Sequence, residues 1–171
     1  MSAPQRGRFT RTPAIDIVHE SELWDEQKDT DGMLRRAIAE AAADVSIKDA
    51  ELAVVLTDDS RIRALNRVWR GIDKPTNVLS FPAKEGRETQ GAPAMLGDIV
   101  IAYETVAREA LAQGTPFLHY LAHLTVHGFL HLRGYDHEAD KEAERMERLE
   151  RAILARLDIP DPYAARDAGS D

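Results

Sequence analysis

The sequence predicts a single α+β domain, built from a small four-stranded sheet and about five helices. The length of 171 residues suits one domain and is long enough to bury a core without disulfides. Short stretches with the apolar pattern of strands lie at 14–19, 52–56, 77–81 and 96–102. Apolar residues at helical spacing predict helices over about 33–45, 60–70, 103–113, 116–133 and 138–157.

Residues that commonly begin and end helices support these boundaries. Asp58 is an N-cap candidate, Gly114 ends one helix, and Thr115 with Pro116 reads as the N-cap and first residue of the next. Gly134 is the expected end of that helix. Polar composition predicts a disordered N-terminal tail over 1–13, a mobile loop over 84–93 and a polar C-terminal tail over 160–171. The predicted domain therefore spans 14–159.

Charge and cysteine content limit the function classes. The net charge of -8 argues against general nucleic-acid affinity. The segment 61–74 is locally basic and the segment 138–150 locally acidic, and each alone is typical of a solvated helix face. The absence of cysteine excludes disulfide partners and thiolate metal sites. The first residues are polar, and no apolar run is long enough to span a bilayer. We therefore expect a cytoplasmic protein without a membrane partner.

Histidines recur every fourth residue along one predicted helix. His127 and His131 are four residues apart, so their side chains are neighbours on the helix and can reach one metal ion. A third ligand must return from another direction. Gly134 permits the chain to reverse, and His137 follows three residues later. Three histidines with an open fourth position predict a zinc site that activates water, although nickel or another divalent ion would also suit them.

Other readings remain open for the neighbouring residues. His119 and His123 more often pack or face solvent at such positions, and His123 is also a candidate partner for a ligand's second ring nitrogen. Asp136 is a ligand partner, a general base or the N-cap of the next helix. The outline H-x-x-x-H-x-x-G-x-x-H is that of metzincin peptidases, but Gly128 stands where those enzymes have their glutamate base.

Three blocks of the sequence carry a resemblance to a known family. They are H-G-F-L-H-L-R-G-Y-D-H from 127 to 137, D-K-P-T-N-V-L-S-F-P from 73 to 82, and L-G-D-I-V-I from 96 to 101. In this order they resemble the bacterial YbeY-type rRNA maturation endoribonucleases. The resemblance implies a zincin-like fold with a small mixed sheet and the metal at the end of the central helix. It also implies that His127, His131 and His137 bind one Zn²⁺.

The resemblance further implies a catalytic role for Arg70. Its position alone suits equally an arginine that interacts with the helix C-terminus. A guanidinium there could stabilise the charge of a phosphodiester transition state, and Arg61, Arg63, Arg67 and Lys74 are candidates to extend the RNA contact. Asp136 and Asp98 are the candidates for the general base.

Three functions compete at this point. The first is a zinc-dependent endoribonuclease specific for single strands, acting in small-subunit rRNA 3′-end maturation and ribosome quality control, with the small subunit or its assembly factors as partners. The second is a metal-dependent hydrolase of another substrate, such as a peptide, against which Gly128 argues. The third is a ribosome assembly factor with a structural zinc, which would have a fourth protein ligand.

Overall fold

The computed structural model describes residues 12–45, 47, 49–84, 92–135 and 139–164. Its elements, in chain order, are β1 (Ala14–His19), the 3-10 helix η1 (Glu22–Glu26), α1 (Thr30–Asp44), β2 (Ala50–Thr57), α2 (Asp59–Arg70), β3 (Val78–Pro82), β4 (Ala94–Ala102), α3 (Tyr103–Gln113), α4 (Phe117–Leu132) and α5 (Asp140–Arg156). The described part thus confirms an α+β fold with four strands and five α-helices. The predictions for 1–11, 85–91 and 165–171 fall outside the described residues.

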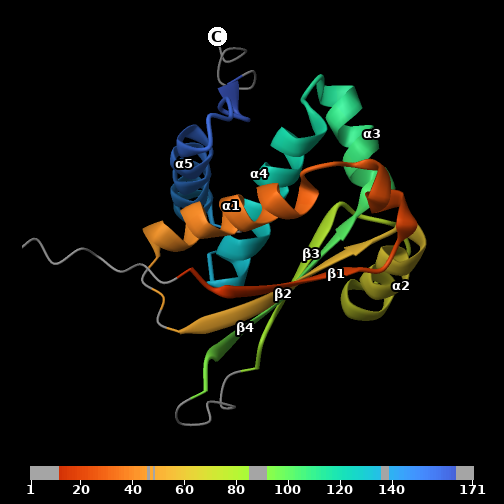
Figure 1. Ribbon diagram of the computed structural model, residues 1–171, viewed down its shortest axis with the longest axis horizontal. Helices are drawn as coiled ribbons and strands as arrows, with labels where there is room; N and C mark the ends of the chain where they lie inside the picture. The colour runs from red at the N-terminus through yellow and green to blue at the C-terminus, as the bar shows by residue number, and fades with distance from the viewer. Residues whose placement is uncertain (1–11, 46, 48, 85–91, 136–138, 165–171) are drawn as a thin grey trace, which may run out of the picture.

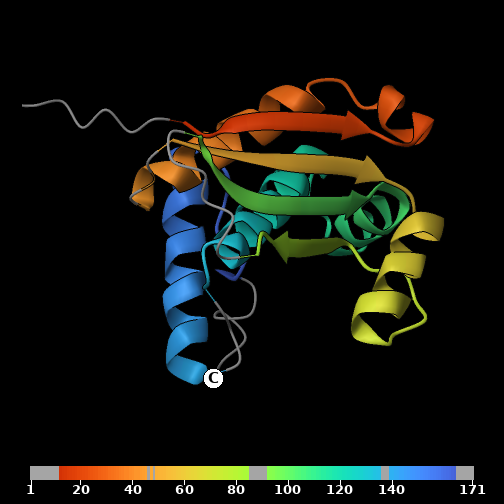
Figure 2. The same cartoon turned by 90° about the horizontal axis from the view of Figure 1, so that it is seen from below.

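The four strands form one mixed sheet in the order β1-β2-β4-β3. β1, β2 and β4 run parallel, and β3 runs antiparallel to β4 (Figure 2). In this order β3 is an edge strand that pairs only with β4 among the described strands. Such an edge leaves backbone groups available for contact with another chain.

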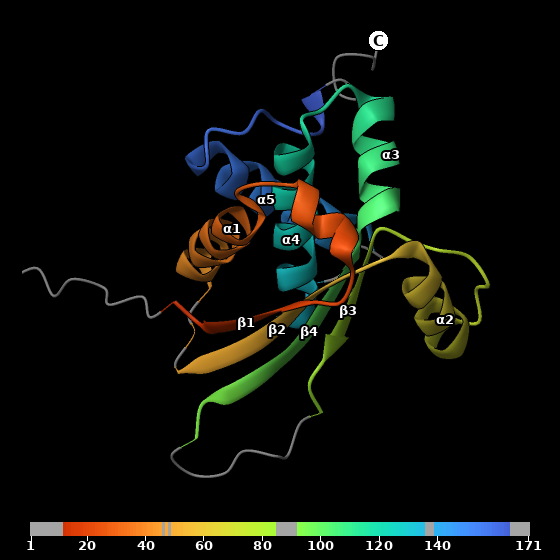
Figure 3. The same ribbon diagram turned by 45° about the vertical axis from the view of Figure 1, so that its right-hand side comes forward.

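Helices cover the two faces of the sheet unequally. α1, α4 and α5 lie on one side, while α2 lies on the other side next to β3 (Figures 1 and 3). Along β4, Ile99 and Ile101 belong to the large core beneath α1 and α4, whereas Val100 packs with Ile62 of α2 in a smaller cluster. Strand side chains alternate between faces, which explains this division.

α4 is the central helix, because many of its side chains are buried in the core. Those with no exposed surface are Leu121, Ala122, Thr125, Val126, Phe129 and Leu130. Against β3 the helix comes close, because Gly128 has no side chain: a Cβ atom there would lie 3.0 Å from Cγ2 of Ile99 and 3.1 Å from Oγ of Ser80. That Oγ donates a hydrogen bond to the Gly128 carbonyl oxygen.

Two local differences from the sequence predictions involve helix starts. Pro116 is the N-cap of α4 rather than its first residue, and α1 begins at Thr30 instead of about 33. The 3-10 helix η1 was not predicted. It holds Trp24, which is 1% exposed and donates from its ring nitrogen to the Thr57 carbonyl oxygen. No helix among the described residues is long and apolar enough to cross a membrane.

Candidate metal centre

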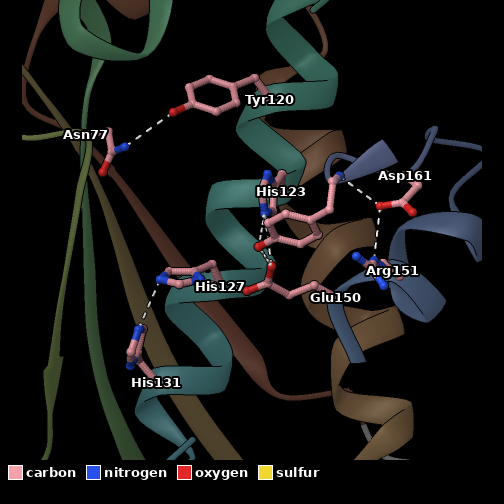
Figure 4. A network of polar contacts seen from close by, with 9 residues as sticks. Asn77, Tyr120, His123, His127, His131, Glu150, Arg151 and Asp161 are labelled. Carbon is pink, nitrogen blue, oxygen red and sulfur yellow. Dashed lines mark hydrogen bonds and ion pairs between the residues drawn. The ribbon is translucent and has the colours of Figure 1, made fainter. Parts of the chain in front are cut away.

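The four histidines of α4 form a stripe along the helix, as their spacing of four residues predicted. His119, His123, His127 and His131 all lie on the helix, and each is half-buried, unlike the fully buried residues between them. Residues four apart on a helix share a face, so the spacing in the sequence accounts for this arrangement. The stripe faces partly outward at the place where α4 meets both β3 and α5 (Figure 4).

Ring nitrogens of His127 and His131 face each other. Their Nε2 atoms are 3.0 Å apart, and the two rings are steeply inclined at 77° (Figure 4). Two ligand nitrogens of a tetrahedral zinc, with bonds of about 2.0–2.1 Å, would be roughly 3.3 Å apart. The pair thus fits two ligands of one ion. It also fits a hydrogen bond between the rings, in which one nitrogen donates and the other accepts.

Glu150, on α5, determines which nitrogen of His127 carries the proton. Its Oε1 lies 2.6 Å from Nδ1 of His127, and its Oε2 lies 3.0 Å from Nε2 of His123. An ionised carboxylate can only accept, so Nδ1 of His127 donates. In the neutral ring the lone pair is then on Nε2, the atom that faces His131. A carboxylate behind a ligating histidine is a common arrangement in metal sites.

The Glu150 carboxylate is enclosed by hydrogen-bond donors. The residue is 1% exposed, and the Tyr163 hydroxyl donates to the same Oε2 that His123 contacts. Burial alone would raise the pKa of Glu150, but hydrogen bonds from His123 and His127 outweigh it and lower the pKa to about 2. So enclosed, this carboxylate positions the rings of His127 and His123.

α4 ends in a tight turn at Gly134, as the sequence predicted. Gly134 has a φ of 86°, its N–H donates to the His131 carbonyl oxygen, and the N–H of Tyr135 donates to that of Leu130. These two bonds form a Schellman motif, which ends a helix with a sharp turn. Asp136 and His137 lie outside the described residues. Among the described residues alone, no group of three potential ligands gathers.

The predicted RNA-contacting residues divide into two groups. Arg61 pairs with Asp58 and lines a hollow of about 630 Å³ with Glu20, Glu22 and Glu26. Arg63 binds Asp73 through two hydrogen bonds. By contrast, the exposed side chains of Arg67, Arg70 and Lys74 form no ion pair with any described residue. This second group lies at and just after the end of α2.

Neither Arg70 nor Asp98 touches the histidine pair. Arg70 is the last residue of α2, and β3 lies between α2 and α4 (Figure 3). Asp98 is exposed and pairs with Phe81, which packs on the α2 side of the sheet. Opposite residues of an antiparallel pair share a face, so the Asp98 side chain lies on the face away from α4. The structure does not bring Asp98 together with the histidines as a base.

Sequence reasoning missed two residues of this network. Glu150 belongs to the acidic run from Glu138, which the charge pattern assigns to a solvated face; for Glu150 that assignment is wrong. The signal that could have found it is the second histidine, His123, four residues before His127, because two neighbouring imidazoles can share one acceptor. Tyr163 lies beyond the predicted domain boundary at 159, yet it hydrogen-bonds Glu150.

These features define an α+β protein whose central helix presents paired imidazole nitrogens anchored by a buried carboxylate. Residues 16–158 match the family model described as endoribonuclease YbeY. The chain therefore belongs to the endoribonuclease YbeY family.

Relatives agree with this assignment over most of the chain. The chain is similar to a protein named endoribonuclease YbeY from Bradyrhizobium sp. (strain BTAi1), with 57% identity over 91% of this chain and 95% of that one. A protein of the same name from Rhodopseudomonas palustris (strain CGA009) is 58% identical over 91% of this chain and 83% of its own. The solution structure of TM1509 from Thermotoga maritima is 25% identical, with a TM-score of 0.54, covering 92% of this chain and 99% of that one.

Proposed function

We propose that this chain is a zinc-dependent endoribonuclease that cuts single-stranded RNA, in small-subunit rRNA 3′-end maturation and ribosome quality control in the cytoplasm. The observation that carries the proposal is the pair of Nε2 atoms 3.0 Å apart, with one of the two rings held by Glu150. The name of the family and of its relatives, endoribonuclease YbeY, supports RNA as the substrate.

The donor set suits zinc. His127 and His131 would supply two nitrogens, and His137, three residues after the turn at Gly134, would supply the third in a zincin-like arrangement. When bound, zinc supplies a Lewis acid that activates water at neutral pH. Glu150 keeps the proton of His127 on Nδ1, which leaves Nε2 available as a ligand.

Arg70 would act on the substrate rather than on the histidines. Its exposed guanidinium can hold a non-bridging phosphate oxygen across the edge of β3. For the general base, Asp136 remains the candidate, because Asp98 lies on the other face of the sheet. Gly128 argues against peptide hydrolysis, because a glutamate side chain there would run into Ile99 and Ser80 of the sheet.

The charge of the chain supports a partner in RNA recognition. With a net charge of -8, affinity for free RNA rests on few cations, and we propose that docking on the small ribosomal subunit or its assembly factors supplies the rest. The exposed cations Arg67, Arg70 and Lys74 would then guide the single strand toward the histidines.

RNA cleavage by matched variants tests this proposal. Single-stranded and duplex RNA are incubated with extensively purified wild type, His131→Ala and Arg70→Glu. We expect cleavage of the single strand by wild type, background cleavage by His131→Ala and strongly reduced cleavage by Arg70→Glu. His119→Ala controls for loss of a half-buried histidine of α4, and Arg36→Glu controls for reversal of an exposed charge. Equal cleavage by wild type and His131→Ala would reject the proposal.

A further inference from the structure

An exposed aromatic pair lies at the end of α2. Trp69 is 67% exposed, whereas the other tryptophan, Trp24, is 1% exposed. The Trp69 ring packs edge-on against Phe81 of β3, with centroids 5.8 Å apart and an angle of 63°. The helix is attached to the sheet through Ile62, which is fully buried, so anchoring α2 does not explain why a tryptophan lies so exposed.

An exposed cation lies next to Trp69 in the sequence. Arg70 follows Trp69 at the end of α2, and Lys74 follows in the next loop, whereas Arg67, two residues before Trp69, faces another side of the helix. The nearby carboxylate, Asp73, is already bound by Arg63 at 2.9 and 3.3 Å. Arg70 therefore adds a positive charge next to Trp69 in a chain of net negative charge.

Edge strand β3 connects this surface to the histidine centre. Ser80 faces α4 and donates a hydrogen bond to the carbonyl oxygen of Gly128, the residue after His127. Phe81, the next residue of the strand, faces the opposite side and contacts Trp69. A short single strand that crosses the edge of β3 would pass from the histidines to Trp69.

We propose that Trp69, supported by Phe81, is a stacking platform for an unpaired base of the substrate RNA, and that Arg70 holds an adjacent phosphate. The inference rests on the proposed function and adds a binding site to it. Sites for single-stranded nucleic acid combine an aromatic face with a positive groove in this way. Their stacking is tolerant of sequence, because every base has a π-face. A protein partner would more often meet a larger apolar surface with fewer charges at its centre.

Binding is measured apart from cleavage. A 2′-O-methyl oligouridylate of about ten nucleotides is titrated into the full chain, and its integrity is checked on a gel. Tryptophan fluorescence with iodide as quencher follows the exposed Trp69, since Trp24 is buried. The RNA should shield Trp69 from iodide. The Kd itself is measured by the anisotropy of the same RNA carrying a fluorescent label, because the variants lack Trp69. Trp69→Ala should raise the Kd by about 5- to 150-fold, as for other stacking aromatics, while Trp69→Phe retains most of the affinity.

Controls separate stacking from folding and from charge. Leu111→Ala removes an exposed apolar side chain, 84% exposed, from α3 and should leave the Kd unchanged. Trp69→Ala should keep the salt dependence of binding, whereas Arg70→Ala should lower its slope by about one phosphate contact. An oligonucleotide of abasic sugar phosphates should bind wild type and Trp69→Ala equally.

The outcomes distinguish this inference from the proposed function. An unchanged Kd for Trp69→Ala, with cleavage by wild type that disappears in His131→Ala, would overturn the platform and leave the nuclease intact. Shielding of Trp69 with a weakened Kd for Trp69→Ala supports the platform even if the pure chain cuts no RNA. Self-association through this surface, seen as an oligomer that Trp69→Ala dissolves while RNA binding is unaffected, would also overturn it.

Discussion

Replacement of Glu150 by glutamine isolates the role of the buried carboxylate. In the wild type its two oxygens accept hydrogen bonds from His127, His123 and Tyr163. Glutamine keeps the shape but offers one carbonyl oxygen and one NH₂ group, which cannot accept. At least one donor therefore loses its acceptor in an almost fully buried place, with Glu150 1% exposed.

The size of the effect follows from the kind of bond that is lost. A hydrogen bond to a charged group contributes about 1.5–3 kcal/mol, so we expect Glu150→Gln to lower the free energy of unfolding by about 2–3 kcal/mol. His127 then faces either a neutral acceptor or an NH₂ group in place of the carboxylate, so its tautomer is held less firmly. Substitutions behind a metal ligand commonly cost 10–100-fold in metal affinity, and we expect a loss of about that size for zinc.

Two assays measure these effects separately. Urea denaturation of metal-free protein gives the change in stability, and competition with a chelator gives the zinc affinity. Glu144→Gln, on the exposed part of the same helix, is the matched control and should change neither. If Glu150→Gln binds zinc as tightly as the wild type, Glu150 does not position a zinc ligand, and the reasoning from the 2.6 Å contact is refuted.

Two further predictions concern the packing of α4. Gly128→Glu should lower the free energy of unfolding by about 1–3 kcal/mol or more and yield no peptidase activity, since a Cβ at 128 already lies 3.0–3.4 Å from three side-chain atoms of the sheet. Thermal denaturation measures the loss of stability, and a peptide-library digest measures peptidase activity. A stable variant that cuts peptides would contradict this prediction. Burial and the hydrogen bond to Glu109 raise the pKa of Tyr120 from 10.0 to about 12, which favours the neutral phenol in the folded state. The stability from this is present below pH 10 and is lost as the pH rises to 12, by at most about 3 kcal/mol. Tyr120→Phe should lack this part of the alkaline loss in urea denaturation, and identical pH profiles for both proteins would contradict the assignment.

Periodicity was sufficient to predict the elements that position the site. Histidine spacing on α4 and the reversal at Gly134 depend on local geometry alone, so both could be read from the sequence. All four strands were placed within a few residues for the same reason, because apolar patterns reflect burial on one or both faces. The mixed sheet followed from the family resemblance rather than from these patterns.

What the sequence did not predict depends on which surfaces meet. α5 carries acids on several sides, and only its packing against α4 decides that Glu150 is buried while Glu144 is exposed. For Asp98 the strand was predicted correctly, but alternation alone does not say which face the histidine helix covers. Trp24 lies on a short 3-10 helix, and five residues are too few to show a periodic pattern of apolar side chains in the sequence.

Metal content and RNA cleavage, measured on one sample of wild type and one of His131→Ala, test the central claim most directly. We predict close to one zinc per wild-type chain, cleavage of single-stranded RNA that a chelator removes and added zinc restores, and neither zinc nor cleavage in His131→Ala. Equal cleavage by both proteins, or zinc-loaded wild type that cuts no RNA in the presence of its ribosomal partner, would contradict a catalytic zinc at His127 and His131.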